Sequence, residues 1–217
     1  ARAECRRLGV NILNLRRSRR IDGVPKHPHY GTLSIAADLE RFDAVVNLPK
    51  LKVHGQFVFT GATKNLFGCV VGKRKAYRHF RSQNCLEGFA RMIHATAAAV
   101  NPVLNLGDGI AALHKNGPRN GEPYPLETVV VSDSYLEFDW YFARRIGLDP
   151  ATTPLFRVVP EDRRQQLEAA CKDLFTDPAF TVPDDFVPAP PNPIEFTLGR
   201  VVRSVWKSIR TRSLTAE

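Results

Sequence analysis

Short runs of aliphatic and β-branched residues recur along the chain, and polar or glycine-containing sequence follows each of them. The runs occupy residues 10–15, 44–48, 103–106 and 128–131. Such runs, bounded by turn-forming residues, are typical of strands that are buried in a sheet. We therefore predict a strand at each of these positions.

Two longer segments, residues 86–100 and 135–146, place apolar residues at helical spacing. Both have terminal signals. Asn84 with Glu87 marks the start of the first segment, Ser134 with Glu137 marks the start of the second, and Asn101-Pro102 and Gly147 follow their ends. Paired capping residues favour a helix start, whereas proline and glycine favour a helix end. We predict a helix over each segment.

Strands that alternate with helices predict an α/β fold, with a largely parallel sheet and flanking helices. Residues 182–193 read VPDDFVPAPPNP, which predicts a proline-rich, extended linker. We therefore expect an α/β domain over residues 1–181, this linker, and a separate segment at residues 194–217.

That last segment, called the tail below, predicts a basic amphipathic helix. Its apolar residues Leu198, Val201, Val202, Val205 and Ile209 fall on one helical stripe. Arg203, Lys207 and Arg210 lie largely on the opposite side. Such a helix either packs back on its own domain or docks on a membrane surface or a partner.

Charge and cysteine content narrow the classes of function. The net charge is +9, concentrated in residues 2–26, in residues 50–81, which contain no Asp or Glu, and in the tail. The four cysteines contain no Cys-x-x-Cys pair, which argues against zinc ribbons and cysteine-rich iron–sulfur sites. The histidines also lack a recognised ligand spacing, so we predict no metal site. No apolar run is long enough to span a bilayer.

Ligands of open parallel sheets bind beyond the carboxyl ends of the strands. After residues 44–48, alternation in an extended chain would place Lys50, Lys52 and His54 on one face. The following glycine-containing segment carries Lys64 and Asn65, and Lys73 and Arg74 come next. These groups predict a site for a phosphate or carboxylate. The spacing around Lys73 is not that of a nucleotide-binding P-loop.

Further polar candidates follow the later strands. Asp108 and Gly109 come after residues 103–106, and a turn-rich loop contains Asn116, Gly117 and Gly121. That loop either binds the ligand or only turns the chain. Asp133 follows the last strand, where it either stabilises the next helix or takes part in catalysis. His54, Asp108 and Asp133 are our candidates for moving protons beside the anion.

Several ordered motifs resemble the family known as domain of unknown function 362. They are NLPKLKVHG at residues 47–55, GATKNLFG at 61–68, GKRKA at 72–76, DGI at 108–110, NGPRNG at 116–121 and the Ser132-Asp133 pair. The resemblance covers roughly residues 43–150, and the chain departs from it at residues 111–115, where the family more often has a Met-Glu-Gly run.

Members of that family commonly carry another α/β segment upstream, so the resemblance implies an N-terminally truncated chain. Some members also carry a ferredoxin-like domain with closely spaced cysteines. The cysteines here are far apart, so an intrinsic iron–sulfur cluster is not expected. The cofactor stays open, and the family transfers no reaction.

Three functions compete on this sequence. The first is binding, with or without proton-transfer or redox-associated chemistry, of an anionic small molecule in a strand-end cleft. The second is an accessory role on a membrane surface or protein partner, through the tail. The third is nucleic-acid binding by the basic second block, which the glycine-rich context disfavours. We expect a cytoplasmic protein that can associate with a membrane periphery.

Overall fold

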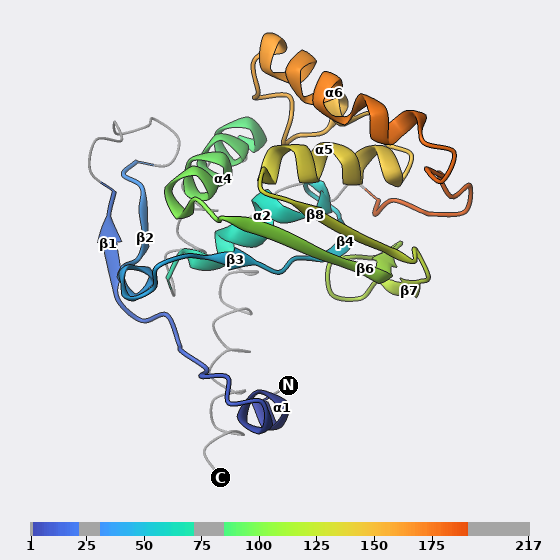
Figure 1. Cartoon of the computed structure of the whole chain (residues 1–217). Helices are drawn as coiled ribbons and strands as arrows, with labels where there is room; N and C mark the ends of the chain where they lie inside the picture. Colours follow the sequence, from blue (N-terminus) through green and yellow to red (C-terminus); the bar gives the residue numbers. More distant parts are fainter. Residues whose placement is uncertain (1, 22–30, 72–84, 191–217) are drawn as a thin grey trace, which may run out of the picture.

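The computed structural model describes residues 2–21, 31–71 and 85–190 and shows a sheet with helices packed on one side of it (Figure 1). The tail, Lys73 and Arg74 lie outside the described residues. The helices are α1 (Arg2–Arg7), α2 (Ala62–Leu66), α4 (Leu86–Val100), α5 (Tyr135–Arg145) and α6 (Glu161–Thr176), with short 3-10 turns at Ala37–Arg41, Phe67–Cys69 and Pro150–Thr152. The strands are β1 (Ser18–Arg20), β2 (Ser34–Ala36), β3 (Val46–Asn47), β4 (Lys50–His54), β5 (Val58–Thr60), β6 (Leu104–His114), β7 (Glu122–Tyr124) and β8 (Thr128–Ser132).

The main sheet is built around β6, its longest strand. Strands β3 and β4 run parallel to β6 on one side of it, and β5 pairs antiparallel with β4. On the other side, β7 and β8 pair antiparallel with β6. Strands β1 and β2 form a separate antiparallel pair. The predicted α/β fold with parallel strands and flanking helices is confirmed, and the antiparallel strands complete the sheet.

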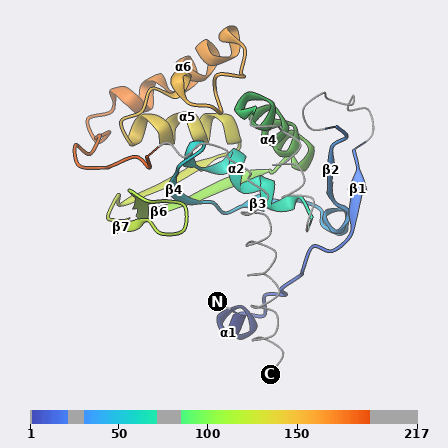
Figure 2. The same ribbon diagram turned by 180° about the vertical axis from the view of Figure 1, so that it is seen from behind.

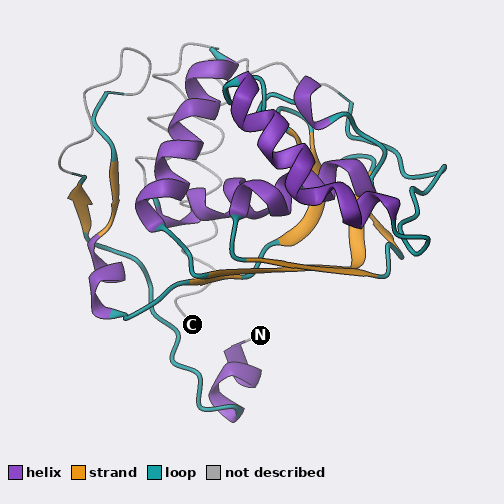
Figure 3. Ribbon diagram, turned by 45° about the horizontal axis from the view of Figure 1, so that its top comes forward, coloured by secondary structure: helices purple, strands orange, loops and turns teal. Residues whose placement is uncertain are grey.

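Helices α2, α4 and α5 cover one face of this sheet, and α6 packs on α5 (Figures 2 and 3). Burial follows the alternation of β4: Leu51 and Val53 are fully buried, whereas Lys50, Lys52 and His54 are half-buried. The core beneath the helices is rich in phenylalanine, with Phe57, Phe59, Phe89, Phe138, Phe142 and Phe156 all fully buried. We call the covered face the inner face and the opposite one the outer face.

The two helices predicted from capping signals are confirmed. Helix α4 spans the predicted residues, and Asn101, just after it, adopts the left-handed conformation with φ 48°. The predicted capping residue Asn84 lies outside the described residues; the N-cap is Cys85, whose thiol accepts a hydrogen bond from the amide of Gly88 over 3.3 Å. Helix α5 begins after Ser134, whose hydroxyl accepts a hydrogen bond from the amide of Glu137, 3.2 Å away. Gly147, with φ 76°, lies two residues beyond its end. Helix α6 had no counterpart in the sequence prediction.

The strand predictions are confirmed in part. Residues 128–131 lie within β8, residues 44–48 contain the short β3, and residues 103–106 overlap the start of the 11-residue β6. The predicted strand at residues 10–15 is wrong. Val10, Ile12 and Leu13 are each at least 41% exposed, because this segment pairs with no strand among the described residues.

The first part of the proline-rich linker packs on the domain instead of leaving it. Val187 accepts a hydrogen bond from the amide of Lys115, at the end of β6, over 2.8 Å. Phe186 is buried against His114 and Tyr124. The described chain therefore ends, at Pro190, close to the carboxyl end of β6.

Candidate functional site

Alternation along β4 gives the outer face a short polar strip, as the sequence predicts. Lys50, Lys52 and His54 occupy the half-buried positions of the strand, and Leu51 and Val53 point into the core. Parallel pairing sets Lys50 opposite Asp108 of β6. The Lys50 Nζ lies 2.7 Å from Asp108 Oδ2, with both side chains more than a third exposed. The hydrogen bond from Lys50 lowers the pKa of Asp108 below its usual value.

The two other described members of the predicted anion site lie elsewhere. Lys64 is on α2, in the helical layer, with its Nζ 5.6 Å from the centroid of the Phe57 ring. The amide Nδ2 of Asn65 donates to Asn47 Oδ1 over 2.8 Å. Lys64 therefore lies in the helical layer, whereas Lys50 and Lys52 lie on β4, and the Phe57 ring beside Lys64 is also 6.0 Å from the ring of His54. This placement does not support the prediction that all these lysines converge on one pocket.

Asn65 belongs to a chain of side-chain amides at the inner face. Asn47 Nδ2 donates to the carbonyl oxygen of Ala62 (3.1 Å) and to Asn105 Oδ1 (2.8 Å). Asn105 in turn donates to the carbonyl oxygen of Ser132, 3.1 Å away. Asn47 and Asn105 are buried, so these bonds tie β3, β6, β8 and α2 together. The motif residues Asn47 and Asn65 thus have a scaffold role.

The carboxylate of Asp139, on α5, is fully buried beside the first turn of α2. Its oxygens accept hydrogen bonds from the backbone amides of Ala62 (2.6 Å) and Thr63 (2.9 Å). A Cβ on Gly61 would come within 2.1 Å of Asp139 Oδ1, so only glycine allows this approach. The backbone amides expected to meet a ligand anion therefore bind the protein's own carboxylate.

Burial raises the pKa of Asp139 to about 6, although the two backbone amides oppose this shift. An acidic residue inside an apolar helix is either exposed to solvent or buried with a partner, and Asp139 shows the second arrangement. A lone acidic residue inside an apolar helix was the available signal, but its partners are 76 and 77 residues away along the chain.

The three candidates for proton transfer do not meet. His54 Nδ1 accepts hydrogen bonds from the amides of Gln56 and Phe57, which builds a turn at the end of β4. Ser132, just before Asp133, pairs with Asn105, near the amino end of β6, while β4 ends near its carboxyl end. At about 3.3 Å per residue along β6, Asp133 and His54 therefore lie roughly 30 Å apart. The prediction placed them together because it assumed that β8 runs parallel to its neighbours.

The glycine candidates act in packing. A Cβ on Gly109 would lie 2.7 Å from Leu51 Cδ1, and one on Gly117 would lie 2.1 Å from the carbonyl oxygen of Val53. Gly121 approaches the carbonyl oxygen of His114 in the same way, at 2.9 Å. Asn116 is exposed in the turn that these glycines allow. The structure thus favours the turn-forming role of this loop over ligand binding.

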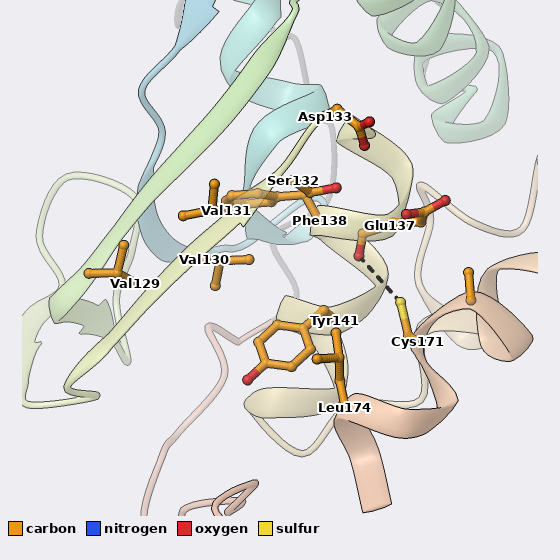
Figure 4. Close-up of a pocket in the computed structure, with 11 residues that line it drawn as sticks. Val129, Val130, Val131, Ser132, Asp133, Glu137, Phe138, Tyr141, Cys171 and Leu174 are labelled. Atoms are coloured by element: carbon orange, nitrogen blue, oxygen red, sulfur yellow. Dashed lines mark hydrogen bonds between the residues drawn. The ribbon is translucent and has the colours of Figure 1, made fainter. Parts of the chain in front are cut away.

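A cavity of about 440 Å³ lies between β8, α5 and α6 (Figure 4). Its wall is mostly apolar, with Tyr141 and Leu174 facing it and Asp133 at one end (Figure 4). Cys171 contributes a thiol that lies 3.9 Å from the carbonyl oxygen of Glu137. Burial raises the pKa of this thiol to about 11, so it is a weak nucleophile at neutral pH.

Among the described residues, no three His, Cys, Asp or Glu side chains are grouped so that they could hold a metal ion. Within the same part of the chain, no helix is long and apolar enough to cross a membrane.

Comparison with known proteins shows the family of this chain. A thylakoid-associated protein of Synechocystis sp. is 35% identical to this chain over 187 residues, which are 84% of this chain. The chain spans 57% of the length of that relative. No solved structure matches the chain. The family model described as "Domain of unknown function (DUF362)" matches residues 1–144, and it ends within α5. Because this match covers residues 1–144, well over half of the chain, the chain belongs to the family of domain of unknown function 362.

Proposed function

We propose that this protein works at the periphery of a membrane, held at an anionic surface by its basic tail. The observation that carries the proposal is the relative that bears the name thylakoid-associated protein. The net charge of +9 supports it, because clustered Lys and Arg are attracted to anionic lipid.

The charges of the tail are the best suited to this contact. The tail contains Arg200, Arg203, Lys207, Arg210 and Arg212, and its acidic residues are Glu195 and Glu217, near its two ends. By contrast, several cations of the described body are paired: Arg17 with Asp38, Arg19 with Glu40 and Lys50 with Asp108. A basic residue near an anionic membrane contributes about 1 kcal/mol, so a few together give measurable binding.

The test is sedimentation of the full chain with vesicles that contain anionic lipid. The variant Arg203→Gln, Lys207→Gln, Arg210→Gln should bind roughly a hundredfold less tightly, because three contributions of about 1 kcal/mol are lost. The matched control is Arg91→Gln, Arg157→Gln, Arg163→Gln, which removes the same charge from exposed positions on the body. Equal loss in both variants would contradict a tail contact, since only total charge would then matter.

Binding of a small anion is a second candidate, favoured by the position of Lys50, Lys52 and His54 along one side of β4. It ranks lower because Asp139 already occupies the amides of Ala62 and Thr63, and Asp108 pairs with Lys50. Calorimetric titration with inorganic phosphate tests it. Lys52→Gln should abolish the binding heat and Lys64→Gln, in the helical layer, should not; a wild-type chain that releases no heat would remove this candidate.

A further inference from the structure

Beside the polar strip of β4, the outer face of the sheet is apolar and open in the described part of the chain. Six large apolar side chains on β6, β8 and the β3 segment lie there, each at least 38% exposed: Val46, Leu48, Leu106, Ile110, Val129 and Val131. Strand pairing makes them neighbours. Leu106 of β6 lies opposite Val131 of β8, and Val46 of β3 lies opposite Leu104, two residues before Leu106 on β6. Asp108, which lies opposite Val129, interrupts this patch. Groups of exposed apolar side chains on one face often mark a surface that another segment or protein covers.

Parallel sheets are normally covered on both faces, and antiparallel sheets that leave one face in water usually carry polar residues on that face. An exposed apolar face is therefore unusual for either kind of pairing in this mixed sheet. Here α2, α4 and α5 fill the inner face (Figure 3). Helix α1 lies on the outer side (Figure 1) but has no buried residue, so it does not cover the patch. A second layer must therefore come from outside residues 2–21, 31–71 and 85–190.

The tail has the length and the pattern for this layer. The described chain ends at Pro190, next to the carboxyl end of β6, where Val187 bonds to Lys115. The eight residues from there to Leu198, extended at about 3.1 Å per residue, reach roughly 25 Å. Ile110 lies four residues back along β6 from His114, or roughly 13 Å. The tail can therefore reach the middle of the outer face.

The apolar stripe of the tail is also long enough to cover the exposed apolar residues of β6. Leu198 to Ile209 spans about 17 Å as a helix, and Ile110 to Leu106 spans about 13 Å of strand. With the apolar stripe turned to the sheet, Arg203, Lys207 and Arg210 point away from it, into solvent. Their ammonium and guanidinium groups then stay hydrated. Asp108, between Leu106 and Ile110 on the same face, is covered together with its partner Lys50, 2.7 Å away, and not as a single charge.

We propose that residues 198–209 pack their apolar stripe on the outer face of this sheet and present their basic side outward. The inference rests on the exposed face and on the chain's reach, and it needs no membrane. It also deepens the proposed function, because a tail packed in this way turns its cations toward an anionic surface.

The test uses thiol alkylation of the full chain in dilute solution without lipid, read peptide by peptide by mass spectrometry so that native cysteines do not interfere. Ile110→Cys places the probe thiol in the middle of the outer face, and Ala169→Cys places a reference thiol at an exposed position on α6. The probe thiol should react at least about tenfold more slowly than the reference thiol, because alkylation requires the tail to leave; tenfold corresponds to about 1.4 kcal/mol. Equal rates would overturn the proposal.

Tail variants identify the cover. Val205→Asp, at the centre of the stripe, should raise the alkylation rate of the probe thiol to that of the reference, whereas Ser204→Asp, which adds the same charge off the stripe, should leave the probe protected. Protection that survives Val205→Asp, or that rises with protein concentration, would overturn the proposal, the latter in favour of a second copy of the chain. Failure of vesicle binding while the probe thiol stays protected would reject only the membrane role.

Discussion

Gly61, just before α2, leaves the space in which the carboxylate of Asp139 reaches the first turn of that helix. A methyl group there would lie 2.1 Å from Asp139 Oδ1. We predict that Gly61→Ala lowers the free energy of unfolding by about 1–3 kcal/mol, the usual effect of overpacking. Gly68→Ala is the control, because no atom lies within 4 Å of its added Cβ. Urea unfolding measures both, and equal stabilities would show that Asp139 can move aside.

Asp139 also predicts a dependence of stability on pH. Its pKa is raised from 3.8 to about 6, so the folded protein binds more protons than the unfolded chain between these values. The stabilising contribution is therefore complete below about pH 4 and lost as the pH rises to about 6. Relative to Asp139→Asn, the wild type should lose roughly 3 kcal/mol across this window, at about 1.4 kcal/mol per pKa unit. Parallel pH profiles of the two proteins would contradict a buried, shifted carboxyl.

At the residue scale, the sequence predicted the side of a strand on which a residue lies better than it predicted which distant residues that residue contacts. Period-2 alternation sufficed to place Lys50, Lys52 and His54 on one side of β4. It could not show that Lys64 lies in the helical layer, or that Asp139 binds the amides of Ala62 and Thr63, because these are contacts between distant segments. The roles of Lys50, Lys52 and His54 in ligand binding remain predictions.

Elements β3, β6, β8 and α2 are joined by the side-chain amides of Asn47, Asn65 and Asn105. Asn105→Leu keeps a similar volume but leaves Asn47 and the carbonyl of Ser132 each without one bond. We predict a loss of about 1–3 kcal/mol in the free energy of unfolding, the penalty for unpaired buried polar groups. Asn120→Leu, in the exposed loop, should change stability by less than about 0.5 kcal/mol. Similar effects of both changes in urea unfolding would show that the network does not hold these elements.

Helices were predicted well because their signals are local. Ser134 and Glu137 are three residues apart, and the apolar period of α4 repeats within its own length. Strands depend on partners that the sequence does not name. Val10 to Leu13 has the composition of a strand but finds no pair among the described residues, whereas β6 continues through Gly107 and Gly109, which resemble a loop. A Cβ at Gly107 would meet Phe138 at 2.3 Å, which explains that glycine in a strand.

At the scale of the whole molecule, the described residues form a filled inner layer and an open outer face, while the tail beyond them carries five cations and two acidic residues. The tail can account for both features, since its apolar stripe can cover the outer face and its cations can contact an anionic surface. The sequence predicted the two sides of the tail, but it could not show an uncovered sheet face, which depends on strand order and on which side the helices pack.

The central claim, electrostatic association with a membrane periphery, is tested most directly by the salt dependence of vesicle binding by the full chain. At about 0.01 M salt, where charges act over roughly 30 Å, the chain should bind vesicles containing anionic lipid and not purely zwitterionic ones. At about 1 M salt, where this range falls to roughly 3 Å, it should be released. Equal binding to both kinds of vesicle, or binding that persists at about 1 M salt, would contradict the account.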